Sequence, residues 1–331
     1  MSEPLRWGIM GTANIADAVA SAIAASPTNT LRAVASRDAS RARAWADAHG
    51  APLACGSYDD LLACGEIDAI YIPLPNSLHA PWTLRAIDAG LPVLCEKPFA
   101  ASAAQAEAVA REAQRAGVVV MEAFAYELHP LFARLRALVA EGRIGRLVSI
   151  SSTFTWRLDD RTQIPASAEL AGGALMDVGC YGVHAARRIT GREPVRAMAM
   201  ASGNAVDDSL YGLLEFAEGV VATVECSIEC EESRRLEVRG ERGLLLAENP
   251  WNPPVDHGRI IVRSGGESEE IITEGGDVYR LEIEHFERAV RGVERLAHGP
   301  FDAVANMRVI DALIASARER RVIESVCCCD A

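Results

Sequence analysis

The first residues with chemical potential lie in a turn between an apolar strand pattern, residues 5–10, and a helix pattern, residues 15–25. Dinucleotide-binding turns follow the pattern Gly-x-Gly-x-x-Gly/Ala. Here Gly11 keeps a glycine, and Ala13 and Ala16 take the other two places. Glycine permits the tight turn, and small residues let the backbone approach a pyrophosphate at the helix N-terminus. A plain strand–turn–helix is the alternative. We predict that the phosphates of a dinucleotide contact Gly11, Thr12, Ala13, Asn14 and Ile15.

The end of the second expected strand, residues 31–36, distinguishes between the two nicotinamide dinucleotides. An acidic residue at this position would bind the ribose 2′-hydroxyl of NAD. This strand ends in Ser36-Arg37, Arg41 follows one turn into the next helix, and Asp38 comes two residues too late. A hydroxyl and two guanidinium groups suit a 2′-phosphate, so we predict NADP rather than NAD. The alternative is that both arginines only solvate a helix start.

A second group of polar residues is spaced for one face of a helix expected at 178–189. Asp177 and Tyr181 are four positions apart, and His184 follows three later. Asp177 is predicted to accept hydrogen bonds from substrate hydroxyls, with an N-cap role as the alternative. His184 either joins this group or packs within the helix. Asp177, Cys180 and His184 could look like metal ligands, but no further ligand cluster accompanies them, so we predict no metal.

The elements that position these residues follow from the hydrophobic pattern. Through residue 123, uninterrupted apolar runs alternate with amphipathic runs, which is the βαβ pattern of a doubly wound parallel sheet. Strands are expected at 5–10, 31–36, 67–72, 92–95 and 118–121, and helices at 15–25, 40–49, 78–89 and 103–116.

The pattern changes after about residue 124, where strands follow one another across tight turns. Strands are expected at 147–156, 195–202, 209–216, 220–229, 236–240, 243–248 and 259–264, and helices at 131–141, 178–189, 282–293 and 303–320. Such a succession indicates an antiparallel or mixed sheet. The sequence therefore predicts an α/β protein with a Rossmann domain at 1–123 and an α+β domain at 124–331.

Composition excludes several classes of protein. The 331 residues carry 33 basic and 46 acidic side chains, a formal charge of −13, which disfavours nucleic acid as a partner. The chain shows neither a continuous apolar stretch long enough to cross a bilayer nor a secretory signal pattern. Nine cysteines without CxxC spacing favour a reducing cytoplasm. Three of them, Cys327, Cys328 and Cys329, carry no motif.

Two longer stretches resemble a known family. The first runs from Pro75-Asn76-Ser77-Leu78-His79 to Glu96-Lys97-Pro98, and the second is Gly172-Gly173-Ala174-Leu175-Met176-Asp177-Val178-Gly179-Cys180-Tyr181. Together they resemble the Gfo/Idh/MocA oxidoreductases. Many members carry histidine at the position of Tyr181. A tyrosine here resembles the branch that holds glucose–fructose oxidoreductase, dimeric dihydrodiol dehydrogenase and NADP-dependent xylose dehydrogenase. The resemblance implies a Rossmann domain followed by a domain with a largely antiparallel open sheet for substrate binding and oligomerisation.

The resemblance also implies site roles. Lys97 and Tyr181 are the expected acid–base pair, because a nearby ammonium lowers the pKa of a phenol towards neutrality. Asp177 is grouped with them, and Trp156, Arg157, Asp177 and His184 are expected at the substrate. Further cofactor contacts are expected from Leu74, Pro75, Asn76, His79, Glu96, Lys97 and Arg161.

These expectations amount to an NADP-dependent oxidoreductase acting on a hydroxyl or carbonyl carbon of a sugar or cyclic diol. The alternatives are a reductase of a keto-sugar, including a nucleotide-linked one, and a catalytically silent NADP-binding sensor. Apolar residues on both faces of strands 209–216 and 220–229 further predict a homodimer or homotetramer formed through the second domain's sheet.

Overall fold

The computed structural model describes residues 3–324 and 326, so the predicted tail Cys327–Cys329 lies outside the described residues. The chain forms two compact units. The first contains the residues up to Leu128 together with Asp277–Val304, and the second contains His129–Gly276 and the residues from Ala305 onward. The predicted boundaries, 1–123 and 124–331, differ from these units at 124–128 and at 277–304, where helix α8 (Val278–Val290) buries Ile283 and Phe286 in the core of the first unit.

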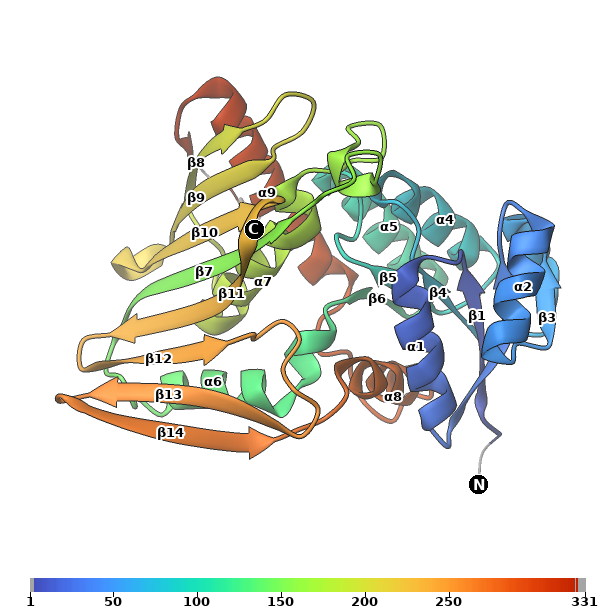
Figure 1. Ribbon diagram of the computed structural model, residues 1–331, viewed down its shortest axis with the longest axis horizontal. Coiled ribbons are helices and arrows are strands. Elements are labelled where there is room, and N and C mark those ends of the chain that lie inside the picture. Colours follow the sequence, from blue (N-terminus) through green and yellow to red (C-terminus); the bar gives the residue numbers. More distant parts are fainter. Residues whose placement is uncertain (1–2, 325, 327–331) are drawn as a thin grey trace. The chain divides into compact units, whose positions relative to one another are not determined.

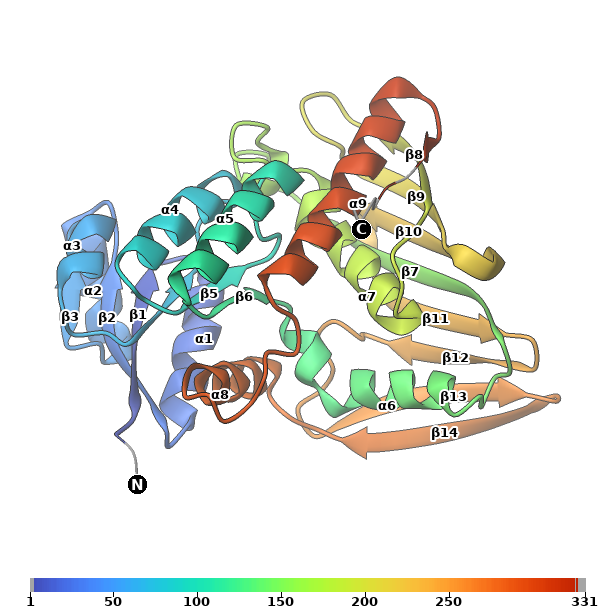
Figure 2. The same ribbon diagram turned by 180° about the vertical axis from the view of Figure 1, so that it is seen from behind.

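The first unit is a six-stranded parallel sheet in the order β3-β2-β1-β4-β5-β6, the arrangement of a Rossmann fold (Figure 1). Helices α1 and α8 cover one face and α4 and α5 the other, as Figures 1 and 2 show. The strands are β1 (Leu5–Met10), β2 (Asn29–Ala35), β3 (Leu53–Cys55), β4 (Ala69–Ile72), β5 (Val93–Glu96) and β6 (Val120–Ala123), and the helices α1 (Asn14–Ala25), α2 (Ala39–His49), α3 (Tyr58–Ala63), α4 (Asn76–Asp88), α5 (Ala103–Ala116) and a 3₁₀ turn, η1 (Ala125–Leu128). The predicted parallel sheet is confirmed.

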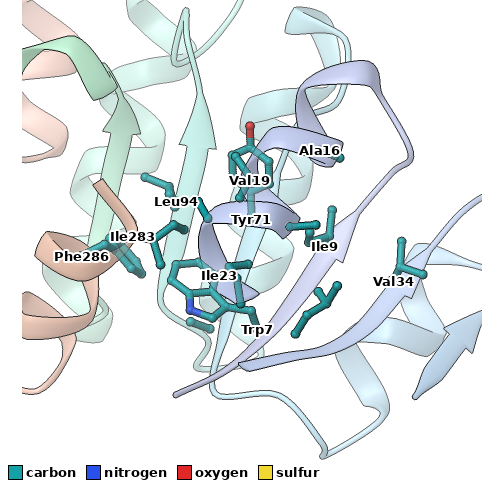
Figure 3. Close-up of a cluster of buried hydrophobic side chains, with 14 of the residues drawn as sticks. Trp7, Ile9, Ala16, Val19, Ile23, Val34, Tyr71, Leu94, Ile283 and Phe286 are labelled. Atoms are coloured by element: carbon teal, nitrogen blue, oxygen red, sulfur yellow. The ribbon is translucent and has the colours of Figure 1, made fainter. Parts of the chain in front are cut away.

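The core of this unit forms where α1 and α8 pack on the sheet (Figure 3). Trp7 of β1 is fully buried, and its ring centroid lies 5.3 Å from that of Phe286. The hydroxyl of Tyr71 points out of this cluster. One face of the sheet is therefore covered in part by a helix, α8, that begins almost 270 residues after the end of β1.

A buried ion pair fixes the segment that follows α8. The Nδ1 atom of His298 lies 3.0 Å from Oε2 of Glu127, and its Nε2 lies 2.7 Å from the carbonyl oxygen of Glu122. Burial lowers the pKa of His298, but the Glu127 carboxylate and this carbonyl outweigh it and raise the pKa above its usual value. A protonated ring donates from both nitrogens, so it joins the end of β6, η1 and the segment after α8.

The second unit is a nine-stranded mixed sheet in the order β14-β13-β12-β11-β7-β10-β9-β8-β15. Among these strands β7 and β10 pair in parallel, and the other described pairings are antiparallel, which confirms a largely antiparallel sheet. The strands are β7 (Leu147–Arg157), β8 (Arg196–Ser202), β9 (Ser209–Glu215), β10 (Val221–Ser227), β11 (Glu229–Gly240), β12 (Gly243–Glu248), β13 (His257–Ser264), β14 (Glu267–Glu274) and β15 (Ile323–Glu324), and the helices α6 (Pro130–Ala140), a π-helix η3 (Leu175–Gly179), α7 (Cys180–Thr190) and α9 (Pro300–Glu319), whose first turn belongs to the other unit; the 3₁₀ turns are η2 (Ile164–Ala166) and η4 (Ala217–Gly219).

Helices α6, α7 and α9 lie on one face of this sheet, behind it in Figure 1 and in front of it in Figure 2. Exposure alternates along β8 and β9 accordingly. Small and aliphatic residues are buried towards the helices, whereas larger apolar side chains are exposed on the opposite face: Met198 45%, Met200 72%, Tyr211 53% and Leu213 45%. An apolar surface of this kind is typical of an interface.

Several elements were not expected from the sequence, among them β3, α3, β14 and β15. Strand β14 was not expected, because its sequence is rich in glutamate; as an edge strand it exposes these charges, which discourage further strand pairing. The helix expected at 178–189 begins earlier, as the π-helix η3. Within the described part of the chain, the helices are too short or too polar to span a bilayer.

Candidate active site

The turn after β1 has the geometry expected for a phosphate-binding turn. Gly11 has a φ of +117°, a backbone conformation that favours glycine, and a Cβ there would lie 3.1 Å from Cδ2 of Leu74. Helix α1 follows, and its N-cap residue Ala13 makes no side-chain hydrogen bond to the helix. No capping side chain therefore competes with an anion for the N–H groups of the first turn.

The end of β2 gathers the residues predicted to bind a 2′-phosphate. Arg41 reaches back from α2 and donates from Nη2 to the carbonyl oxygen of Thr12 at 3.2 Å, so its guanidinium lies beside the β1–α1 turn. Asp38 caps α2 and accepts from the backbone N–H groups of Ser40 and Arg41, which, with the Ser40 hydroxyl, lower its pKa. The Asp38 carboxylate is thus used within the helix cap, while the hydroxyl of Ser36 accepts from the Asp38 N–H at 3.3 Å.

Arg37 is also placed on this side of the unit, beside the first residue of α3. Burial raises the pKa of Tyr58, and the guanidinium of Arg37 opposes that shift by charge and hydrogen bonding. Arg37 is exposed, as is Arg41. Two cations therefore flank the end of β2, which fits a 2′-phosphate.

The segment after β4 is braced from within by His79. Pro75 and Asn76 are half-buried at the start of α4, whereas His79 is fully buried. The ring nitrogens of His79 lie 2.7 Å from the carbonyl oxygen of Pro98 and 2.6 Å from that of Leu74, and burial lowers its pKa to about 4. Its side chain therefore supports the two turns that follow β4 and β5, and its cofactor contact stays a prediction.

Glu96 and Lys97 end β5 at the carboxyl edge of the parallel sheet, where such sheets bind ligands. Tyr71 of β4 donates a hydrogen bond to Oε1 of Glu96 at 2.6 Å, and the N–H of Lys97 donates to Oε2 at 3.3 Å. Burial raises the pKa of Glu96, and the Lys97 ammonium opposes that shift. The Glu96 carboxylate is therefore fixed beside Lys97.

A second buried carboxyl, Glu282 of α8, belongs to the same neighbourhood. It is 1% exposed, and burial together with the Glu96 carboxylate holds its pKa well above the usual range. Burial, with Glu96 and Glu282, also raises the pKa of Tyr279 to about 12. Sequence reasoning missed these two residues, although a glutamate within the apolar stripe Val278, Glu282, Phe286 is a detectable signal.

In the second unit, Asp177 lies on the π-helix η3 and Tyr181 on α7, which continues from it. The two glycines before η3 are required by close contacts. A Cβ on Gly172 would lie 2.4 Å from the carbonyl oxygen of Ile164, and one on Gly173, at φ +115°, would lie 2.1 Å from Oδ1 of Asp207. Oδ2 of Asp207 accepts from the N–H of Leu175 at 2.7 Å, so this carboxylate caps the start of η3.

Strand β7 orients both polar residues of this helix. Trp156 donates from Nε1 to Oδ2 of Asp177 at 2.9 Å, and the ring of Phe154, two residues earlier on the same strand face, lies 5.5 Å from that of Tyr181. Asp177 and Tyr181 are both partly exposed, whereas His184 is fully buried in α7. The expected group thus contains Asp177 and Tyr181 as accessible members.

Arg157, the last residue of β7, and Arg161, in the loop that follows, are both paired within their own unit. Arg157 donates to Oδ1 of Asp159 at 3.0 Å, and Arg161 forms an ion pair with Asp208. Both arginines are exposed.

The comparisons with known proteins decide the family. A family model described as "Oxidoreductase family, NAD-binding Rossmann fold" matches residues 5–124, and the model "GFO/IDH/MocA C-terminal domain" matches residues 132–246. The chain belongs to the GFO/IDH/MocA oxidoreductase family. This membership confirms the resemblance drawn from Glu96-Lys97-Pro98 and the stretch from Gly172 to Tyr181.

Three GFO/IDH/MocA relatives are similar over nearly their whole length. D-xylose 1-dehydrogenase (NADP(+)) 2 from Haloferax volcanii is 41% identical, with 97% of this chain and 99% of that protein covered. The structure of KijD10, a 3-ketoreductase from Actinomadura kijaniata in complex with NADP and TDP-benzene, is 29% identical with a TM-score of 0.89, covering 95% and 98%. Aldose-aldose oxidoreductase from Caulobacter crescentus, complexed with glycerol, is 25% identical with a TM-score of 0.90, covering 97% and 100%.

Proposed function

We propose that this oxidoreductase transfers hydride between NADP and a carbon that bears a hydroxyl group in a free sugar or a cyclic diol. The observation that carries the proposal is the Asp177 carboxylate, which Trp156 holds one helical turn before the accessible Tyr181. A fixed carboxylate accepts hydrogen bonds from neighbouring hydroxyls of a polyol, and a phenol exchanges a proton with the reacting oxygen. The xylose dehydrogenase relative acts on such a substrate with NADP.

The residues around the β1–α1 turn fit NADP. The pyrophosphate would be held by the N–H groups of α1 next to Gly11, and the 2′-phosphate by Ser36, Arg37 and Arg41. The support is the uncapped helix start and the position of the Arg41 guanidinium beside Thr12. The nicotinamide, when bound, supplies the hydride chemistry.

Proton transfer is assigned to Tyr181, with Lys97 as the cation that lowers the pKa of the phenol. Support comes from the relatives: KijD10 was also solved as variants in which one lysine or one tyrosine is replaced, each with TDP-benzene and NADP. Glu96, fixed by Tyr71, orients the strand end that carries Lys97.

A free, uncharged substrate is favoured over a nucleotide-linked one. Arg157 at the end of β7 and Arg161 in the following loop are already paired with Asp159 and Asp208. The carboxylate in each pair offsets the charge of its guanidinium, which weakens the attraction for a diphosphate. Reduction of a nucleotide-linked keto-sugar is the second candidate, because the KijD10 relative is a 3-ketoreductase solved with TDP-benzene.

The test follows the absorbance of the reduced nicotinamide with D-xylose, other aldoses, cyclic diols and a TDP-linked keto-sugar. We expect oxidation of a free aldose or diol with NADP. Tyr181→Phe and Lys97→Met should each lower kcat by about 10²–10⁴-fold while NADP still binds. The double variant should be little worse than the poorer single one, because the two residues act as a unit. Near-normal turnover of Tyr181→Phe would show that the phenol is structural. NADP binding without turnover of any substrate would favour the sensor.

We also propose that the protein is a homodimer or homotetramer in the cytoplasm. The exposed apolar face of β8 and β9, including Met200 and Tyr211, supports pairing of sheets between copies. The odd number of nine cysteines without paired spacing supports a reducing compartment.

A further inference from the structure

Three aromatic rings of the second unit form one cluster around Tyr181. The ring of Trp251 lies 5.6 Å from that of Tyr181 at an interplanar angle of 48°, and the ring of Phe154 lies 5.5 Å from Tyr181 at 57°. Trp251 and Phe154 also stack on each other, with centroids 6.3 Å apart and an angle of 10°. Each ring thus contacts the other two, and the Tyr181 ring packs against both Phe154 and Trp251.

Trp251 reaches this cluster from the loop that joins β12 to β13. It is 4% exposed, although it belongs to a loop of the sequence Asn249-Pro250-Trp251-Asn252-Pro253-Pro254. Three prolines restrict the backbone of this loop, so the indole is held at low entropic cost. A tryptophan almost fully buried from a loop indicates a specific packing role.

Arg234 of β11 contacts both the loop that carries Trp251 and the ring of Phe154. The N–H of Asn249 donates to the carbonyl oxygen of Arg234 at 2.8 Å, and Arg234 donates from Nη1 to Oδ1 of Asn249 at 3.4 Å. The side chain of Asn249 also donates to the carbonyl oxygen of Asn252 at 2.6 Å, and its φ of +50° makes the sharp turn. The guanidinium carbon of Arg234 lies 5.2 Å from the ring centroid of Phe154, a cation–π contact.

We propose that Trp251 is a positioning residue for proton transfer: its indole, carried by a loop that Asn249 and Arg234 fix, holds the Tyr181 phenol in one orientation. Asp177, the other polar residue of this helix face, is fixed separately by Trp156. Without the indole, the phenol would rotate into the space left, and its hydroxyl would no longer keep a constant distance from the reacting oxygen. The inference rests on the proposed role of Tyr181.

The first experiment is a double-mutant cycle on kcat with the best substrate found. Trp251→Leu should lower kcat about 10–100-fold, because a displacement of about 1 Å can cost 10² in rate, while the Kd for NADP stays the same. Trp251→Phe should restore most of the rate, because it restores an aromatic wall. In the Tyr181→Phe background, Trp251→Leu should cost nothing further, since the hydroxyl it positions is gone.

The control is Phe216→Leu, which removes a ring from another buried aromatic residue of the same unit. Phe216 is 1% exposed and follows β9 at the end opposite Ser209, about 20 Å along the strand from the segment that contacts η3. It should lower the melting temperature and leave kcat unchanged. An equal loss of kcat from Trp251→Leu in both Tyr181 backgrounds would overturn the proposal, as would an equal loss from Phe216→Leu.

A second measurement needs no substrate, so it separates this inference from the proposed function. The chain has six tyrosines, and after labelling with fluorotyrosine the Tyr181→Phe variant identifies the fluorine resonance of residue 181. We expect one narrow line in the parent protein and a broadened or split line in Trp251→Leu. An unchanged line would refute the positioning role even if the enzyme is active, and a changed line would support it even if no substrate is found.

Discussion

Replacing Arg41 by alanine should weaken NADP binding about tenfold and leave NAD binding unchanged. The guanidinium lies beside the β1–α1 turn through its 3.2 Å hydrogen bond to the carbonyl oxygen of Thr12. A guanidinium has five N–H donors, so this bond can persist while others bind a 2′-phosphate. The expected loss therefore concerns one phosphate contact and not the turn itself.

The magnitude follows from the exposure of Arg41. A hydrogen bond between charged groups contributes about 1.5–3 kcal/mol. Because Arg41 is exposed, water and salt screen the contact, so the lower limit applies. About 1.4 kcal/mol corresponds to a tenfold change in Kd. The same screening predicts that the difference between parent and variant shrinks as ionic strength rises.

Isothermal titration of both proteins with NADP and NAD, at low and high salt, measures this difference. Arg43→Ala is the matched control, since Arg43 lies on the same helix but pairs with Asp47 at 2.7 Å. It removes the same charge from α2 without removing a group beside Thr12. If Arg41→Ala weakened NAD as much as NADP, or if Arg43→Ala had the same effect, the assignment of the 2′-phosphate to this position would be refuted.

Three further outcomes are expected. In urea titrations, Gly173→Ala should lower the free energy of unfolding by at least about 2 kcal/mol, because its Cβ would lie 2.1 Å from a carboxylate oxygen of Asp207. Gly191→Ala is the control: its φ is also positive but nothing lies near its Cβ, so it should cost about 1 kcal/mol or less. The ion pair with Glu127 raises the pKa of His298, so the pair stabilises the fold fully below the ordinary histidine pKa of about 6.5, and this stabilisation is lost as the pH rises through the raised pKa. His298→Asn should therefore flatten the dependence of the melting temperature on pH in this range. An unchanged dependence would contradict the pairing. Met200→Glu should dissociate the proposed oligomer in light scattering, while Val255→Glu, at a similarly exposed residue in a loop, should not. Dissociation by both variants or by neither would exclude β8 as the interface.

The hydrophobic pattern of the sequence was sufficient to predict most strands of both sheets. Uninterrupted apolar runs predicted the parallel strands except the short edge strand β3, and Gly11 marked a turn that needs positive φ. Strand β14 was missed because four of its eight residues are glutamates exposed at a sheet edge, where burial does not select apolar side chains. The π-helix η3 was missed because its start depends on Asp207, which is distant in sequence.

The sequence predicted site residues whose side-chain chemistry marks them, but it did not predict the neighbouring side chains that orient them. Asp177 was recognised, but its orientation by Trp156 depends on a strand–helix contact that spacing alone does not reveal. His79 was placed at the cofactor because of its motif, whereas two carbonyl groups enclose its ring. Trp251 carried no motif, and its importance follows from packing across three separate segments.

The insertion of one unit within the other has a consequence for biosynthesis. Trp7 is packed against Phe286, so the first unit completes its core after the residues of α8 have left the ribosome. At about 5–20 residues per second, the roughly 150 residues between Leu128 and Asp277 take about 7–30 s to synthesise. During that interval the nascent sheet exposes the apolar surface that α8 later covers, and exposed surface of this kind is prone to aggregation. The inserted unit, whose strands are nearly all made by then, has time to collapse first.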